Sequence, residues 1–277
     1  EANERLQVLA QLNNGETFDI TGLRSSPLIA ENSIWVISSE NTVERLQLNG
    51  LSSESYATQI DPGQMLYGAG HIWVNNQGSA TVTRINPETD EILNIETERS
   101  PQPPFMVGED VWIHSMLTGR LQRLTGNPSP SIRIGLNTSS PIASSNHIWY
   151  LNSTNTDLNR VTQAGRIDSL ALDELGQQLL YHESSNSLVV ITTGQLLIID
   201  TESLQISQRI QLQSSLATAY QDNQYIWAML SDGTGIIRLT VASGELQSLT
   251  YANLSHISVT DNRVWPTSRD GIAMLDQ

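Results

Sequence analysis

The sequence predicts an all-β fold, a seven-bladed β-propeller with four antiparallel strands in each blade. Three observations lead to this prediction. Tryptophans recur every 37 to 40 residues, each lies in a short apolar run, and most of these runs follow a two-residue turn. One interval is twice as long as the others, and a valine in its middle completes the series. The seven markers are Trp35, Trp73, Trp112, Trp149, Val189, Trp227 and Trp265.

Residues 69–95 illustrate how one unit divides into strands. The Ala69-Gly70 turn, where glycine tolerates positive φ, precedes the apolar run at residues 72–74, which we expect to be the second strand. Residues 81–85 alternate polar and apolar side chains, and residues 91–95 follow after another turn, as third and fourth strands. A helical solenoid would need a 3.6-residue period, which is not found, so the pattern favours a propeller.

The two ends of the chain predict how the propeller closes. The last unit stops after residues 271–277, which read as a third strand, and residues 4–9 read as a fourth strand without the other three. We therefore expect the N-terminal strand to complete the last blade, because this arrangement removes an open sheet edge. On this interpretation residues 1–277 form a single propeller domain.

Composition narrows the possible partners. The formal net charge is −15, with 29 acidic and 14 basic residues, whereas nucleic acids and anionic membranes attract clustered positive charge. No apolar stretch approaches the ~20 residues of a membrane-spanning helix, so we expect no direct membrane insertion of this segment. The chain has no cysteine and no recognisable metal or cofactor motif, so we expect no cofactor. It begins at Glu1 rather than methionine, and we expect other domains in the full-length protein.

Arginine also follows the repeat. Five arginines come 10 or 11 residues after the marker tryptophan of their unit, in the expected third strand: Arg45, Arg84, Arg123, Arg160 and Arg238. They could form a ring for an anionic ligand, or each guanidinium could pack on a tryptophan or pair with a carboxylate. A residue fixed to one repeat position favours the structural role, and we expect the tryptophans to be core residues as well.

Candidate binding residues lie on the expected first strands and in the loops that join second to third strands. First strands line the channel of a propeller, so aromatic and imidazole side chains there could face a ligand. A metal site needs three or four ligands at defined spacing, which no group of histidines provides, and no residue is assigned as catalytic. The candidates at the channel mouth and rim are Tyr67, Phe105, His114, Tyr181, His182, Tyr220, Asp232, Arg269 and Asp270.

The second unit resembles a known superfamily. Residues 70–76 (GHIWVNN) and 79–89 (SATVTRINPET) are similar to the repeat of the YVTN-type and virginiamycin B lyase-like propellers. The resemblance implies a bacterial protein, and many such propellers are extracytoplasmic. The lyase branch is similar to magnesium-dependent enzymes that use histidine and glutamate, with a glutamate three residues after the tryptophan. Here that position holds Ser38, Asn76, Ser115, Asn152, Leu230 and Ser268.

These observations favour a non-catalytic domain that binds a protein or a small molecule, as the sensor or interaction module of a larger bacterial protein. Two alternatives remain. A lyase-like enzyme would need a histidine beside a carboxylate at the channel mouth, and a structural spacer would bind no ligand. The fold alone does not separate these roles, because propeller function depends on side chains grafted on a generic scaffold.

Overall fold

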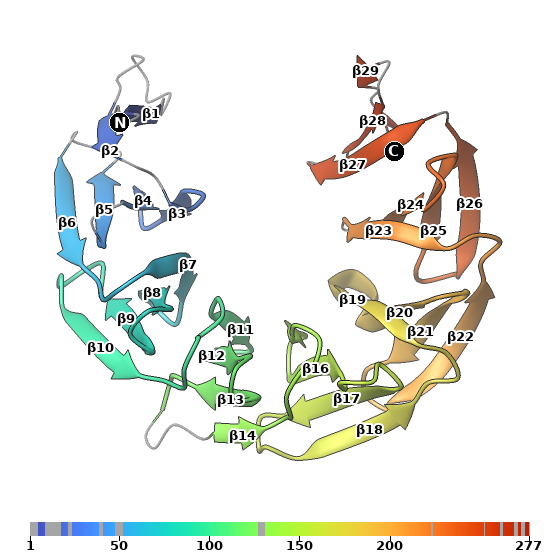
Figure 1. Ribbon diagram of the computed structural model, residues 1–277, viewed down its shortest axis with the longest axis horizontal. Helices are drawn as coiled ribbons and strands as arrows, with labels where there is room; N and C mark the ends of the chain where they lie inside the picture. Colours follow the sequence, from blue (N-terminus) through green and yellow to red (C-terminus); the bar gives the residue numbers. More distant parts are fainter. Residues whose placement is uncertain are drawn as a thin grey trace. The chain divides into compact units, whose positions relative to one another are not determined.

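The computed structural model describes residues 5–8, 18–21, 24–38, 41–47, 52–126, 131–222, 224–251, 253–260, 263–268, 271–272 and 275–276. These residues form seven four-stranded antiparallel sheets, one for each predicted unit, and one two-stranded sheet (Figure 1). Contacts group the chain into two compact units, Glu1–Asn137 and Thr138–Gln277. Within the described residues, no helix has the length and apolar character that crossing a membrane requires.

The first unit contains the two-stranded sheet and the first three four-stranded sheets, and within each sheet the strands pair in chain order. The two-stranded sheet consists of β1 (Arg5–Val8) and β2 (Phe18–Thr21). The other strands are β3 (Leu28–Ala30), β4 (Ser33–Ile37), β5 (Thr42–Gln47) and β6 (Ser53–Ala57); β7 (Pro62–Gly68), β8 (His71–Asn76), β9 (Thr81–Ile85) and β10 (Ile92–Glu96); and β11 (Phe105–Val107), β12 (Asp110–Ser115), β13 (Arg120–Arg123) and β14 (Ser131–Arg133).

The second unit contains the fourth to seventh sheets and a short 3₁₀-helix, η1 (Glu183–Ser185). The strands of the fourth and fifth sheets are β15 (Ile142–Ala143), β16 (His147–Leu151), β17 (Asp157–Thr162) and β18 (Ile167–Ala171), then β19 (Gly176–His182), β20 (Ser187–Thr192), β21 (Gln195–Asp200) and β22 (Gln205–Gln211). The last two sheets are built from β23 (Leu216–Gln221), β24 (Tyr225–Leu230), β25 (Gly235–Thr240) and β26 (Glu245–Thr250), then β27 (Leu254–Thr260), β28 (Arg263–Ser268), β29 (Gly271–Ile272) and β30 (Leu275–Asp276).

The N-terminal strand has a different partner from the one that the sequence predicts. β1 pairs antiparallel with β2, and the pairing runs from Arg5 opposite Thr21 to Val8 opposite Phe18. The prediction that this strand joins the last sheet is therefore wrong for the described residues, while residues 4 and 9 of the predicted segment lie outside them. A nearby partner requires the closure of a much shorter loop, so its entropic cost is lower. In the seventh sheet both β29 and β30 pair with β28.

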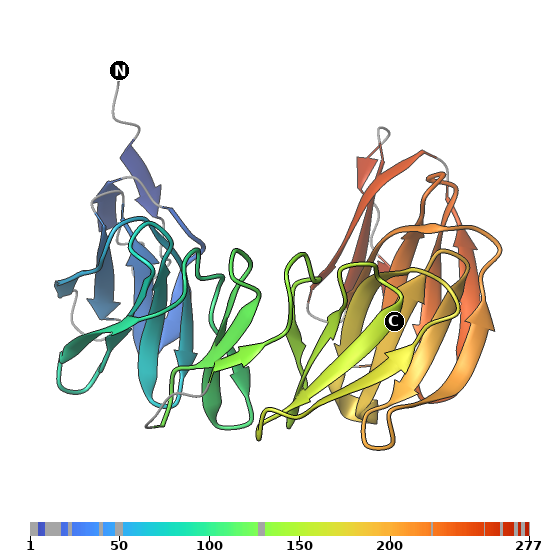
Figure 2. The ribbon, with the colours of Figure 1, turned by 60° about the horizontal axis from the view of Figure 1, so that its bottom comes forward.

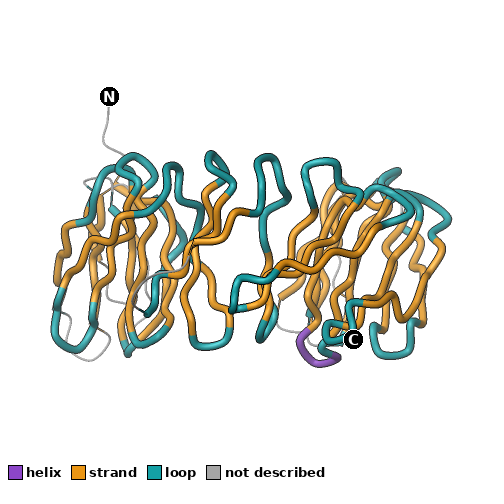
Figure 3. Tube along the Cα trace, turned by 90° about the horizontal axis from the view of Figure 1, so that it is seen from below, coloured by secondary structure: helices purple, strands orange, loops and turns teal. Residues whose placement is uncertain are grey.

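First strands of consecutive sheets lie side by side within each unit. In the first unit β3 contacts β7, and in the second unit β15 contacts β19, β19 contacts β23 and β23 contacts β27. Figure 2 shows the sheets of the second unit following one another in this order, and Figure 3 shows loops at both ends of the strands of each unit. Each of these first strands is an edge strand of its own sheet, since it pairs only with the second strand.

The core of each unit lies between neighbouring sheets, and five of the six marker tryptophans are part of it, whereas Trp265 is half-buried. The side chains of Trp35, Trp73, Trp112, Trp149 and Trp227 are at most 2% exposed, which confirms their prediction as core residues. Four of the indole N–H groups donate to an atom of the residue five positions earlier, at the preceding turn: Ala30 O, Gly68 O, Ser144 Oγ and Asp222 Oδ2. The turn thereby satisfies the polar atom of a buried ring.

The recurrent arginine lies directly opposite the tryptophan on the neighbouring strand. The register pairs Trp35 with Arg45, and the same pairing recurs between Trp73 and Arg84, Trp112 and Arg123, Trp149 and Arg160, and Trp227 and Arg238. In four of these pairs the guanidinium lies 5.1–6.0 Å from the indole ring centroid, a cation–π distance. In the fifth pair, Arg123 makes an ion pair with Asp110 at 3.3 Å. The structural role predicted for these arginines is confirmed.

Two of these arginines also connect their sheet to the next one. Arg45 Nη1 donates to the carbonyl oxygen of Pro87, at 2.8 Å, in the turn between the third and fourth strands of the second sheet. Arg160 Nη1 donates to Thr201 O at 2.8 Å and Glu202 O at 2.7 Å, in the equivalent turn of the fifth sheet. One side chain therefore covers the tryptophan of its own sheet and fixes the position of the adjacent one.

The fifth sheet replaces the whole pair rather than the tryptophan alone. Val189 lies opposite Ile198, both are nearly fully buried, and no arginine occupies the position. The two side chains belong to an aliphatic cluster that includes Ile226 and Ile237 of the sixth sheet. Without an indole ring, the position offers no cation–π partner to an arginine, and aliphatic packing takes the place of the pair.

Replacing Arg160 by methionine should destabilise the second unit. The substitution keeps most of the aliphatic packing but removes two charge-assisted hydrogen bonds to carbonyls and an ion pair with Asp168 at 2.9 Å, so we expect a loss of roughly 2–3 kcal/mol. Denaturant unfolding measures this loss. The matched control is Arg166→Met, which removes an exposed partner of the same Asp168 and should change stability by less than about 0.5 kcal/mol. Equal effects of the two substitutions would contradict the connecting role of Arg160.

Candidate functional site

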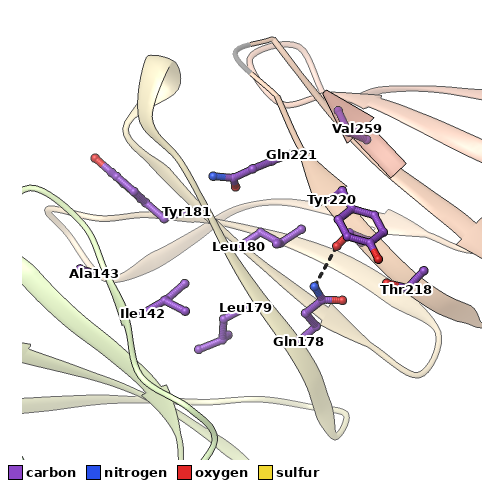
Figure 4. A pocket seen from close by; sticks show the side chains of 11 residues that line it. Ile142, Ala143, Gln178, Leu179, Leu180, Tyr181, Thr218, Tyr220, Gln221 and Val259 are labelled. Atoms are coloured by element: carbon purple, nitrogen blue, oxygen red, sulfur yellow. Dashed lines mark hydrogen bonds between the residues drawn. The ribbon is translucent and has the colours of Figure 1, made fainter. Parts of the chain in front are cut away.

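A groove crosses the first strands of all four sheets in the second unit. Its cavity volume is about 520 Å³, within the range of small-molecule sites, and it is open on one side. The lining residues come from β15, β19, β23 and β27 (Figure 4): Ile142, Ala143, Gln178, Leu179, Leu180, Tyr181, Thr218, Ala219, Tyr220, Gln221 and Val259. Two of the nine predicted site residues, Tyr181 and Tyr220, are brought together here.

The two tyrosines project from neighbouring first strands and are partly exposed (Figure 4). The hydroxyl of Tyr181 donates to Asn186 Oδ1 at 3.0 Å, which fixes the ring beside the β19–β20 connection. The ring of Tyr220 meets the exposed His256 edge to face, with a centroid distance of 6.1 Å. Both rings are therefore held in place while part of each remains open to a ligand.

Three polar residues of the groove were missed by sequence reasoning. Gln178, Thr218 and Gln221 lie on the same first strands as the tyrosines. The amide of Gln178 donates from Nε2 to the carbonyl oxygen of Ala219 at 2.9 Å and so bridges β19 and β23. The available signal was the recurrence of uncharged polar residues within consecutive first strands, at Gln177-Gln178 and at Thr218 and Gln221.

His182 follows Tyr181 on β19 but does not line the groove. It is 3% exposed, and its Nδ1 is 2.8 Å from Ser185 Oγ of η1. Burial lowers the pKa of His182, because an imidazolium would lose its hydration there. The structure thus places this predicted ligand-facing histidine in the interior.

His114 lies in the first unit, at the end of β12, and is also buried. Its side chain is 3% exposed, and neither ring nitrogen has a hydrogen-bond partner. It borders a small cavity next to the ion pair of Glu98 and Arg120, whose atoms lie 3.6 Å apart. Burial lowers the pKa of His114 to about 4, so the ring is neutral near pH 7.

The remaining predicted site residues are dispersed. Tyr67 and Phe105 lie on β7 and β11, first strands of the first unit; the Tyr67 hydroxyl donates to Glu31, and this bond raises the pKa of Tyr67. The carboxylate of Asp232 accepts bonds from the hydroxyl and backbone N–H of Thr234, which lower its pKa and mark it as a turn residue. Arg269 and Asp270 lie outside the described residues.

The chemistry available in the groove is that of neutral hydrogen bonding. Among the described residues that line it, none carries a carboxylate, an imidazole or a guanidinium. Within the described part of the chain, no cluster of three or more histidine, aspartate or glutamate side chains has metal-site geometry. The arrangement can bind a ligand through amides, hydroxyls, aromatic rings and aliphatic side chains.

Comparison with solved structures identifies the fold. Virginiamycin B lyase from Staphylococcus aureus superposes with a TM-score of 0.57 at 15% identity, covering 91% of this chain and 95% of that one. BamB from Moraxella catarrhalis gives a TM-score of 0.61 at 15% identity, with coverages of 93% and 84%. The chain has the fold of the virginiamycin B lyase-like β-propellers. Dihydro-heme d1 dehydrogenase NirN, with a TM-score of 0.67 at 11% identity and coverages of 94% and 66%, is a further propeller-like neighbour.

The propeller neighbours include proteins named as enzymes, the lyase and the dehydrogenase, and one, BamB, whose name states no activity. No protein-family model and no curated protein sequence matches the chain.

The burial of His114 predicts that the propeller loses stability in acid. Its folded pKa, about 4, lies below its ordinary value, so the unfolded chain binds the proton more readily. The stability associated with the neutral ring is complete above about pH 6.5 and is lost as the pH falls towards 4, a loss of roughly 3 kcal/mol.

Denaturant unfolding between pH 4 and 7 checks this prediction with two variants. His114→Leu should reduce the acid loss, the remainder arising from other groups such as the buried His182 and the half-buried His147, whose pKa values are also lowered by burial. The control His256→Gln, at an exposed position, should leave the loss unchanged. An unchanged pH dependence in His114→Leu would show that the imidazole is not protonated on unfolding in this range.

Proposed function

We propose that this propeller is a non-catalytic binding domain whose recognition surface includes the groove of the second unit. One observation carries the proposal: four consecutive first strands line one open cavity of about 520 Å³, in which β19 and β23 contribute uncharged polar and aromatic side chains and β15 and β27 contribute apolar ones. Structural residues repeat along the chain, as the tryptophan and arginine pairs do. The groove residues vary more from sheet to sheet: the position opposite the marker holds Leu180 in the fifth sheet and Tyr220 in the sixth. Such variation is expected of a site grafted on a repetitive scaffold.

The positions of the histidines support binding over acid–base catalysis. General acid–base catalysis requires a titratable group within hydrogen-bond reach of the reacting atoms. His114 and His182 are buried away from the groove, and no described histidine forms an ion pair with a carboxylate within 4.0 Å. The groove itself offers amides, hydroxyls and apolar surface, which suit recognition.

We further propose that the domain acts in a larger, extracytoplasmic bacterial protein as a sensor or interaction module. Its seven sheets would be the seven blades of a single propeller, as the 37- to 40-residue spacing of the markers predicts. The net charge of −15 supports a partner other than nucleic acid or an anionic membrane. The partner would be a protein or a small molecule that contacts the groove.

Native mass spectrometry tests the binding role. The domain is incubated with a bacterial envelope extract, and the species that remain bound are weighed. We expect a bound species that is lost in Gln221→Arg, because this exposed substitution places bulk and charge in the neutral groove. The control Gln213→Arg, exposed in the loop before β23, should retain it.

Three results would overturn the proposal. If wild-type protein retains nothing specific, the domain behaves as a spacer. If the retained species changes its covalent structure with time in wild type but not in Gln221→Arg, the groove belongs to an enzyme. Retention that both substitutions leave intact would place the recognition surface elsewhere.

A further inference from the structure

We propose that the groove takes an uncharged, hydroxyl-rich ligand of the carbohydrate class. This inference rests on the proposed binding function and specifies the chemistry of its ligand. It is carried by the neutral lining of the groove, by the two tyrosines and the amide and hydroxyl groups around them, and by the irregular edges of the strands that form it.

The uncharged lining of the groove disfavours a charged ligand. Burying an ion requires an opposite charge or several hydrogen bonds to replace its hydration. The chain has 29 acidic and 14 basic residues, yet the eleven described lining residues include neither kind. A neutral ligand would enter the groove without an unpaired charge on either side.

The polar groups of the groove match hydroxyl groups in kind. A sugar hydroxyl both donates and accepts a hydrogen bond, and so do the side chains of Thr218, Gln221 and Tyr220. Gln178 uses its Nε2 on Ala219 O, which leaves its carbonyl oxygen as an acceptor next to the groove. These groups occupy the two central strands, β19 and β23.

The aromatic rings supply the second element of carbohydrate recognition. The C–H face of a sugar ring carries a partial positive charge, and the face of an aromatic ring is negative, so the two stack favourably. Tyr181 and Tyr220 stand on adjacent first strands, partly exposed and each held by a neighbouring group (Figure 4). Leu180 and Val259 add apolar surface to the groove.

An extended peptide added as an extra strand is the alternative that the strand edges disfavour. Such a peptide needs a regular row of free backbone donors and acceptors. The register of β19 shifts between Gly176 and Gln178, and that of β23 between Leu216 and Thr218, which interrupts the row. The Gln178 amide also occupies Ala219 O on the edge of β23.

Titration calorimetry and saturation-transfer NMR test the ligand class with defined probes. The neutral probes are maltotetraose, cellotetraose, mannotetraose and N,N′,N″,N‴-tetraacetylchitotetraose. The charged probes are tetragalacturonate and the deacetylated chitosan tetramer, and a capped peptide of alternating threonine and valine represents the strand-like ligand. We expect at least one neutral tetrasaccharide to bind, and the charged probes to bind at least tenfold more weakly or not at all.

Substitutions locate the binding in the groove. Gln221→Ala should weaken the neutral sugar about fivefold to tenfold through the loss of one neutral hydrogen bond. Tyr220→Ala should weaken it by tenfold or more, and Tyr220→Phe, which keeps the ring, by less than Tyr220→Ala. The control Gln213→Ala should have no effect. Tyr220 packs against the core cluster that contains Ile257, so its replacement by alanine can also affect folding. Gln221 is exposed, and its replacement by alanine tests the groove with little effect on folding.

Several results would overturn the inference: no binding of any neutral sugar, charged probes that bind as tightly, binding of the capped peptide instead, or sugar affinity unchanged by Gln221→Ala and Tyr220→Ala. The outcome remains separate from that of the binding proposal. If the sugars fail but an envelope species is still lost in Gln221→Arg, the ligand class is wrong and the groove remains the recognition surface.

Discussion

The cross-strand pair of tryptophan and arginine, present in five of the seven sheets, is the interaction on which those sheets depend. The indole fills the space between neighbouring sheets, and its N–H is in most cases satisfied by the preceding turn. The guanidinium lies over the ring on the adjacent strand, as Arg45 does over Trp35 at 5.1 Å. Because an arginine can donate five hydrogen bonds in fixed directions, the same side chain also reaches carbonyl oxygens of the next sheet. One residue pair thus fixes a sheet internally and against its neighbour.

The first strands do not contain the repeated pair of tryptophan and arginine. The tryptophan and arginine lie on the second and third strands, so the sheet is held together at its middle. The first strand is attached along one edge only, and it accommodates register shifts in β7, β19, β23 and β27. Irregular edges resist the addition of foreign strands, and their side chains can vary without weakening the core. The groove of the second unit is formed by strands of this kind.

The sequence predicted the features that depend on local pattern. The spacing of the tryptophans gave the sheets, and the fixed interval to Arg160 and its equivalents gave a structural role that the register confirms. The pairing of β1 with β2 was missed, because the sequence pattern does not show whether β1 pairs with a strand close to it in the chain or with the distant last sheet. Gln178 and Gln221 were missed because four consecutive residues of β19 and of β23 line the groove, so the alternation of a strand does not single them out. His114 was predicted at the channel rim but is buried. Because β12 is buried on both faces, the alternation of polar and apolar residues does not show which of its side chains point inward.

A double-mutant cycle on Trp35 and Arg45 tests the central claim most directly. The free energy of unfolding is measured for wild type, Trp35→Phe, Arg45→Met and the double variant. If the pair acts as one unit, the two losses are not additive, and we predict a coupling of about 1 kcal/mol or more. Losses that add within about 0.3 kcal/mol would contradict the account, because tryptophan and arginine would then stabilise the sheet independently.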